Sequence, residues 1–297
     1  MTRRHHTEPA YESLMGKDLY HLACTHERAL QSVERVAGSA KISDTSGAFR
    51  LKFEDGLIMK GRRMFSASHA SKVAYWIESL KSPMLPAVQG RYKSALLLDW
   101  VPGTSIEPCS SFDSRTHGVC AEFQANLHCT TDPGISSTPP RFTLEELGNR
   151  LADNCSALYS HGLLDKTDTR QLSELAKTDQ IQCATSLVHD DLCGENLIRD
   201  PVGNVRVIDN EGLGVGFAPI DIARTVYRWQ MDMDTERLYL QHYESVCPAD
   251  EFRNNRSFWI ASVLVESACY RMKGTNNSRN IPIRAIRRLL RNAGRAR

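Results

Sequence analysis

The chain has 297 residues and a formal net charge of +2, and 41% of its residues are hydrophobic. These values are ordinary for a globular protein of about two domains, and they favour neither a nucleic-acid binder nor a membrane-surface protein. The start of the chain is polar, and no segment has the length and apolar character of a transmembrane helix. We therefore expect a cytoplasmic protein whose partners include no membrane and no nucleic acid.

The nine cysteines form an odd and scattered set. None of them belongs to a C-x-x-C pair, and no paired histidine spacing accompanies them, so the pattern predicts neither a zinc site nor a disulfide framework. We interpret them as free thiols in a reducing compartment.

The first third of the chain alternates between helical and strand patterns. Residues 16–36 carry apolar side chains at helical spacing, which predicts an N-terminal helix lying on a sheet. Apolar side chains then alternate over residues 49–53, and the turn 54–56 leads to a second apolar run that ends at Lys60. This pattern predicts a β-hairpin whose second strand ends on a lysine.

A short amphipathic helix is predicted over residues 71–80, before two prolines. Glu78, the single acidic residue between Gly61 and Leu98, falls opposite the apolar stripe of this helix. We therefore expect its carboxylate to point to solvent.

The composition changes abruptly after a buried strand predicted over residues 95–98, where turn residues follow. We place a domain boundary there, between residues 1–99 and 100–297. The second part is mostly helical, and one of its helices begins with Thr143 and Glu146 in the spacing of a capping box.

Residues 187–209 carry the chemistry. They contain His189, Asp191 and Asn196 in the pattern His-x-Asp-x-x-x-x-Asn, followed by two short apolar runs around a Pro-Gly-Asn turn and then Asp209. The runs predict a β-hairpin, which returns the chain to its starting point and brings the oxygen-bearing side chains together. Such ligands suit Mg²⁺, which keeps most of its waters and binds one or two carboxylates plus phosphates.

This stretch has the layout of a kinase catalytic loop with two departures: Asp190 replaces the usual arginine, and residues 209–211 read Asp-Asn-Glu instead of Asp-Phe-Gly. With Ile-Asp-Ile-Ala at 220–223, the chain resembles the aminoglycoside phosphotransferase and choline kinase-like family of small-molecule kinases. The resemblance implies an α+β, protein-kinase-like fold. A small N-terminal lobe with an antiparallel sheet would bind the nucleotide, and a larger, mainly helical C-terminal lobe would hold the catalytic and substrate-binding residues.

The resemblance also implies roles for individual residues. Asp191 would be catalytic, accepting a hydrogen bond from the acceptor hydroxyl. Asn196 and Asp209 would hold Mg²⁺, and Lys60 would pair with the nucleotide phosphates. His189 would brace the loop.

Three further residues are candidates for nucleotide binding. Gly47 ends the loop 43–47, whose backbone N–H groups could lie over the phosphates. Asp99 and Val101 stand where kinases join their lobes and meet the adenine base. By the same resemblance, Asp221 would be a buried carboxylate that supports the catalytic loop.

The resemblance predicts an enzyme that transfers the γ-phosphate of ATP, or of GTP, to a hydroxyl of a small molecule. The interval between Asp209 and Asp221 is too short for the activation segment of a protein kinase, which favours a small acceptor. Antibiotic modification is one possibility. A metabolic kinase of choline, ethanolamine, homoserine or a sugar is an alternative, and a non-catalytic nucleotide-binding module is another.

The acceptor stays open at this stage. A polycation such as an aminoglycoside would need carboxylates, and several are available: Asp232, Asp234, Glu236, Glu244, Asp250, Glu251 and Glu266. A choline-like acceptor would need an aromatic cage, which Tyr227, Trp229, Trp259 and Tyr270 could supply. At the C-terminus, an apolar face at 283–290 is surrounded by arginines. We favour a terminal helix packed on the lobe over a basic surface for an anionic partner.

Overall fold

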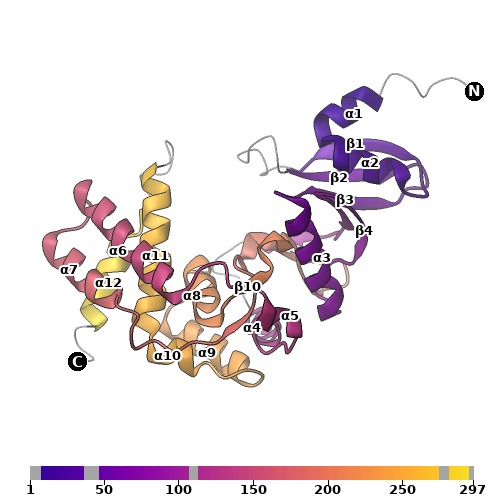
Figure 1. Cartoon of the computed structure of the whole chain (residues 1–297). Helices are drawn as coiled ribbons and strands as arrows, with labels where there is room; N and C mark the ends of the chain where they lie inside the picture. Colours follow the sequence, from indigo (N-terminus) through magenta and orange to yellow (C-terminus); the bar gives the residue numbers. More distant parts are fainter. Residues whose placement is uncertain (1–7, 37–46, 107–112, 274–280, 294–297) are drawn as a thin grey trace, which may run out of the picture. The chain divides into compact units, whose positions relative to one another are not determined.

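The computed structural model describes residues 8–36, 47–106, 113–273 and 281–293. The chain divides into two compact units, one made of residues up to 106 with 195–213 and the other of 107–194 with 214 onward (Figure 1). The fold is α+β, as predicted, with an antiparallel sheet in the first unit and mainly helices in the second. The first unit thus includes the hairpin that follows Gly194 in the sequence. The predicted domain boundary between residues 1–99 and 100–297 stays a prediction.

The sheet of the first unit has five antiparallel strands in the order β1-β2-β3-β5-β4. Their bounds are Leu30–Arg35 for β1, Gly47–Phe53 for β2, Ile58–Arg63 for β3, Val88–Tyr92 for β4 and Ala95–Asp99 for β5. The predicted β2–β3 hairpin is therefore confirmed. Lys60 lies in the middle of β3, opposite Arg50 on one side and Leu98 on the other, because β3 continues beyond the expected end.

The helices of this unit are α1 (Glu8–Met15), α2 (Lys17–Thr25) and α3 (Ala67–Leu80). The predicted helix over 16–36 is wrong after Thr25, because residues 30–35 form strand β1 on the edge of the sheet. Leu30 and Val33 lie three positions apart, a spacing that fits either a helix or a twisted strand. The pairing of this segment with β2 makes it a strand. The core joins Leu19 of α2 to Phe49 and Leu51 of β2.

The hairpin after the catalytic loop is also confirmed. Strands β8 (Leu197–Arg199) and β9 (Val205–Val207) pair with each other, and β6 (Thr104–Ser105) extends them to three strands. Gly103 is needed before β6: its φ is 138°, and a Cβ there would lie 2.2 Å from the carbonyl oxygen of Arg199. Val207 N–H donates to the Met84 carbonyl at 2.8 Å, which ties the hairpin to the segment after α3.

The second unit consists of helices around a two-stranded ribbon of β7 (Thr185–Val188) and β10 (Gly214–Phe217). Its helices are α4 (Ser114–His128), α5 (Pro133–Ser137), α6 (Leu144–Ser160), α7 (Lys166–Leu175), α8 (Ala218–Arg228), α9 (Met233–Glu244), α10 (Asp250–Asn254), α11 (Arg256–Lys273) and α12 (Ile283–Ala293). Helix α6 begins with the predicted capping box of Thr143 and Glu146. Helix α11 is central, packing on α6, α8 and α12.

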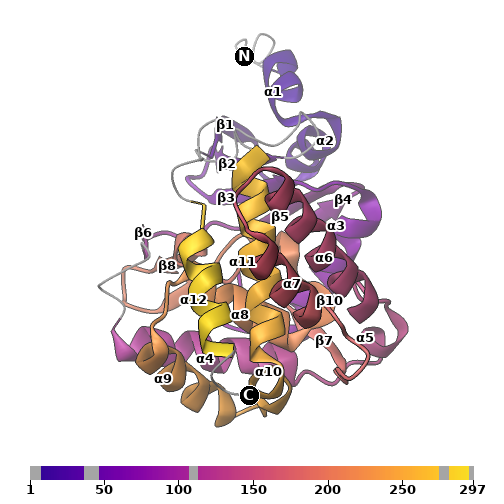
Figure 2. The same cartoon turned by 90° about the vertical axis from the view of Figure 1, so that its left-hand side faces the viewer.

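Helix α12 packs on α11 and also contacts α7; Figure 2 shows it alongside α11. Its apolar face is buried through Ile286, Leu289 and Leu290, and Arg287 pairs with Asp168 at 2.9 Å. The interpretation as a packed terminal helix is therefore confirmed.

A disulfide joins Cys129, at the end of α4, to Cys247, after α9. The free-thiol interpretation is wrong for these two residues, which lie 118 positions apart in the sequence and meet only because α4 packs on α9. Within the described ranges, none of the helices combines the length and hydropathy that crossing a bilayer requires.

Candidate active site

The catalytic loop of the second unit is anchored by a buried carboxylate on α8. Asp221 is 0% exposed, and it accepts hydrogen bonds from the backbone N–H groups of His189 at 3.1 Å and of Asp190 at 2.8 Å. His128 on α4 contacts the same oxygen as the His189 N–H, Oδ2, through Nε2 at 3.0 Å. Burial opposes ionisation, but the hydrogen bond and charge of His128, followed by those of His189, lower the pKa of the Asp221 carboxyl below its usual range.

This network extends through His128, whose Nδ1 lies 2.7 Å from the Tyr243 hydroxyl on α9. Three helices thus converge on the segment before Asp191. His189 itself is 0% exposed, and its ring packs edge-on against Phe123. A ring so enclosed fits the bracing role that the resemblance implies for His189.

Asp190 has a left-handed backbone, with φ of 72°. Non-glycine residues adopt this conformation uncommonly, and aspartate is among those that tolerate it best. Its carboxylate pairs with Arg224 on α8 and with Arg141 at 2.5 Å, and Arg224 also donates to its carbonyl at 3.3 Å. Asp190, which stands where kinases have arginine, therefore forms ion pairs that hold the catalytic loop to Arg141 and Arg224.

Asp191 is accessible, with 53% of its side chain exposed, and lies 3.6 Å from Nε of Arg228 through Oδ1. Cys193 N–H donates to its carbonyl at 3.0 Å. Cys193, which lies in the catalytic loop, is buried.

In the first unit, Lys60 Nζ lies 2.8 Å from Oδ1 of Asp209. Arg62, two residues further along β3 and so on the same face, approaches Asp209 at 3.8 Å and pairs with Glu211 at 2.6 Å. The strand thus presents two buried cations to the carboxylates that follow β9. Arg62 was not predicted as a site residue, although its position two residues after Lys60 on a strand places both side chains on one face.

Helix α3 adds a histidine to this cluster. His69 Nε2 lies 2.8 Å from the Glu211 carbonyl, whereas Glu78 is exposed, as its place on the helical wheel predicted. Lys60 therefore has Asp209 as its carboxylate partner. Asp209 is left-handed, with φ of 62°, a second non-glycine residue held in that conformation beside the catalytic motif.

Asn196 and Asp209 flank the β8–β9 hairpin. Asn196 ends a short 3₁₀ turn before β8, and its carbonyl accepts from Ile208 N–H at 2.8 Å, next to Asp209. An amide and a carboxylate are hard oxygen donors that fit Mg²⁺. Among the described residues, no group of three or more His, Cys, Asp or Glu side chains is placed to hold a metal.

The other nucleotide candidates lie at strand ends. Gly47 is the first residue of β2, and the rest of the predicted phosphate loop, 43–46, lies outside the described residues. Asp99 ends β5 and accepts from Gln89 Nε2 at 2.7 Å, and Val101 follows half-buried.

The aromatic cage considered for a choline-like acceptor is not formed by its two tryptophans. Trp229 is 4% exposed and Trp259 is 0% exposed, so both indoles belong to the core of the second unit. Tyr227 bonds to Ser267 at 2.7 Å, and Tyr270 is exposed.

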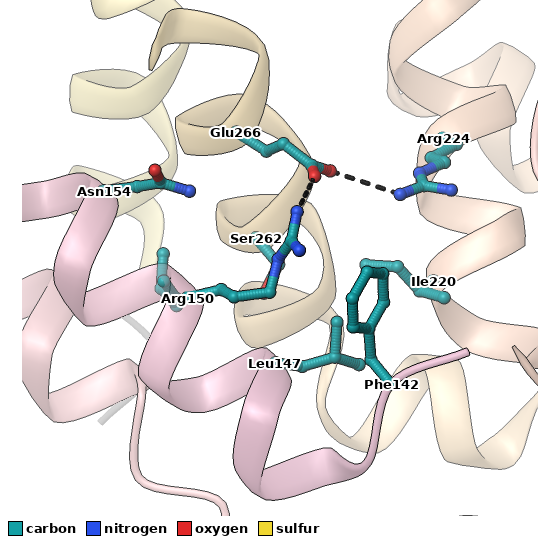
Figure 3. A pocket seen from close by; sticks show the side chains of 9 residues that line it. Phe142, Leu147, Arg150, Asn154, Ile220, Arg224, Ser262 and Glu266 are labelled. Atoms are coloured by element: carbon teal, nitrogen blue, oxygen red, sulfur yellow. Dashed lines mark hydrogen bonds and ion pairs between the residues drawn. The ribbon is translucent and has the colours of Figure 1, made fainter. Parts of the chain in front are cut away.

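A pocket of the second unit lies between α6, α8 and α11 (Figure 3). Glu266 lines this pocket and pairs with Arg150 at 2.6 Å and with Arg224 at 3.2 Å, and the Arg150 guanidinium lies over the ring of Phe142. Its volume of about 20 Å³ is room for little more than a water molecule. It is a structural ion-pair cluster and no acceptor site.

Comparison with known proteins gives the family. A profile described as the phosphotransferase enzyme family (APH) matches residues 79–250, more than half of the chain. The chain belongs to this family. It is therefore a phosphotransferase, and the matched range includes the catalytic loop, the hairpin and Asp221.

No curated protein matches the phosphotransferase in sequence. Solved structures match its fold. An ethanolamine kinase of Plasmodium vivax has 12% identity and a TM-score of 0.59, over 97% of this chain and 86% of that one. A structure titled macrolide 2'-phosphotransferase type I has 16% identity and a TM-score of 0.61, over 98% and 99%. A choline kinase of Cryptosporidium parvum Iowa II has 13% identity and a TM-score of 0.61, over 96% of both chains.

Proposed function

We propose that this phosphotransferase moves the γ-phosphate of ATP, or of GTP, to a hydroxyl group of a small molecule with the help of Mg²⁺. The observation that carries the proposal is the 2.8 Å ion pair of Lys60 with Asp209, which joins the expected phosphate-binding cation to the expected metal-binding carboxylate. Family membership supports the reaction class, and a cytoplasmic location is part of the proposal.

In this proposal, Asp191 orients the acceptor hydroxyl and accepts its proton. Phosphoryl transfer requires mainly positioning and neutralisation of charge, so a fixed loop is essential. The hydrogen bonds from His189 and Asp190 to Asp221 hold the backbone on the N-terminal side of Asp191. Its 53% exposure leaves room for an acceptor to approach.

Lys60 binds the nucleotide phosphates, and Asn196 and Asp209 hold the metal. Magnesium would supply charge neutralisation on the phosphates when bound. Arg62 approaches both carboxylates, Glu211 at 2.6 Å and Asp209 at 3.8 Å, and its positive charge offsets their mutual repulsion. Gly47, Asp99 and Val101 are the proposed contacts for the rest of the nucleotide.

The acceptor is a hydroxylated small molecule. Relatives in fold include kinases of choline and ethanolamine and phosphotransferases of macrolides, which supports metabolic and antibiotic acceptors alike. Homoserine and sugars are further candidates. A non-catalytic nucleotide-binding module is the alternative of another class, which the presence of Lys60, Asp191, Asn196 and Asp209 together makes the weaker one.

The test is turnover of ATP and of GTP with Mg²⁺ by the purified protein. The acceptors are aminoglycosides, macrolides, choline, ethanolamine, homoserine and sugars, and Asp191→Ala is the control. We expect acceptor-dependent release of nucleoside diphosphate, reduced about 100-fold or more in the variant, because an aligned base contributes that much to the rate. Nucleotide binding with no turnover that depends on Asp191 would favour the binding module.

A further inference from the structure

Arg228, the last residue of α8, is held on the catalytic loop. Its Nη2 donates to the Cys193 sulfur at 3.2 Å, and its Nε lies 3.6 Å from Asp191. The next residue fixes this position, because the buried indole of Trp229 donates to the Leu192 carbonyl at 2.9 Å. The guanidinium is thus placed by its neighbours, and 38% of the Arg228 side chain remains exposed beside Asp191.

Of the seven carboxylates considered above for a cationic acceptor, four pair with arginines. Glu266 lies between Arg150 and Arg224 (Figure 3), and Glu236 forms two hydrogen bonds of 2.5 Å with Arg256. Further pairs join Asp190 to Arg141, Glu244 to Arg253 and Asp234 to Arg237. A polycationic acceptor would therefore meet arginines at these carboxylates, and a like charge at Asp191 as well.

We propose that Arg228 selects acceptors that carry an oxyanion, a carboxylate or a phosphate, close to the hydroxyl that is phosphorylated. The proposal rests on the proposed function, since the hydroxyl lies at Asp191 only if Asp191 has the assigned role. A guanidinium offers a planar fork of N–H donors that matches the oxygens of a carboxylate or phosphate. Arg228 can thus hold the anionic group of the acceptor while its hydroxyl faces Asp191.

The experiment uses two acceptor series in which only the charge changes: glycolate, ethylene glycol and ethanolamine, and then glucuronate, glucose and glucosamine. KM, kcat and binding by calorimetry are measured for the wild type, Arg228→Gln and Arg228→Glu. Arg237→Gln is the matched control, because Arg237 is an exposed arginine on α9 that pairs with Asp234. Hydrolysis of ATP without acceptor is followed in all variants and in Asp191→Ala.

We expect the wild type to favour the anionic member of a series, with a KM at least about tenfold lower, as a charge-assisted hydrogen bond provides. Arg228→Gln should raise that KM about 10- to 100-fold and leave KM for the neutral member unchanged, and Arg228→Glu should reverse the order toward the cation. Arg237→Gln should keep the wild-type order.

A wild-type preference for the cationic or neutral member, or the same order of acceptors in all Arg228 variants, would overturn the inference while the proposed function stands. ATP hydrolysis that depends on Asp191, together with no binding of glycolate or glucuronate, would also overturn the inference. Absence of all turnover that depends on Asp191 would overturn the proposed function, and this inference with it.

Discussion

His128 on α4 and Asp221 on α8 form a fully buried pair, Nε2 to Oδ2, at 3.0 Å. The same carboxylate receives the N–H groups of the catalytic loop, so the pair links helix packing to the position of Asp191. Tyr243 completes the arrangement from α9.

Replacing His128 by alanine should destabilise the fold by about 3–5 kcal/mol, because it leaves a buried carboxylate without its partner. Urea unfolding followed by tryptophan fluorescence would measure this loss. His161→Ala is the matched control, since His161 is exposed at the end of α6 and should change stability little. Equal effects of the two substitutions would show that the buried pair contributes nothing.

Lys60→Met should weaken nucleotide binding about 10- to 100-fold, because a charge-assisted contact to the phosphates is lost. Lys52→Met on the neighbouring strand is the control, as Lys52 is exposed. Glu78→Gln should leave the affinity unchanged, because Glu78 is exposed and Lys60 pairs with Asp209. Titration with a fluorescent ATP analogue gives the nucleotide affinity of all three variants. If Glu78→Gln lost as much affinity as Lys60→Met, the result would contradict the assignment of Asp209 as the carboxylate partner of Lys60.

Cleavage of the disulfide should lower stability. Cys129 and Cys247 close a loop of 118 residues, for which chain entropy predicts about 4–5 kcal/mol. The double substitution to serine should lower Tm, whereas Cys24→Ser, at an exposed thiol, should not. Peptide mapping without reductant should recover the cross-linked pair, and alkylation of both cysteines in the unreduced protein would refute the bond.

His117 makes stability depend on pH. It is buried on α4 against Trp229, and burial lowers its pKa below the ordinary 6.5. Among the groups facing it, Asp113 opposes this shift and His242 adds to it. As the pH falls below 6.5, His117 takes up a proton in the unfolded chain more readily than in the native protein. The free energy of unfolding therefore decreases until the pH has passed the lowered pKa of the native state.

The free energy of unfolding of the wild type should therefore fall as the pH is lowered below 6.5, and His117→Gln should flatten that decline. His161→Gln should keep the wild-type slope because His161 is exposed. Identical slopes in the three proteins would exclude His117 as the source.

The sequence by itself determined those elements whose signal is local. Alternation around a turn gave the β2–β3 and β8–β9 hairpins, a capping box gave the start of α6, and the helical wheel placed Glu78 in solvent. The catalytic motif gave the family, because its residues lie within one short stretch. Such elements can be predicted from the sequence because residues close together in the chain determine the local backbone conformation.

Only the tertiary structure decided the rest. Residues 30–35 became a strand because β2 offers them hydrogen-bond partners, and Cys129 met Cys247 because α4 packs on α9. Burial of Trp229 removed it from any ligand cage, and Arg228 reached Asp191 from a distant helix. Each of these outcomes depends on contacts between residues far apart in the chain, and periodicity along the sequence carries no information about such pairs.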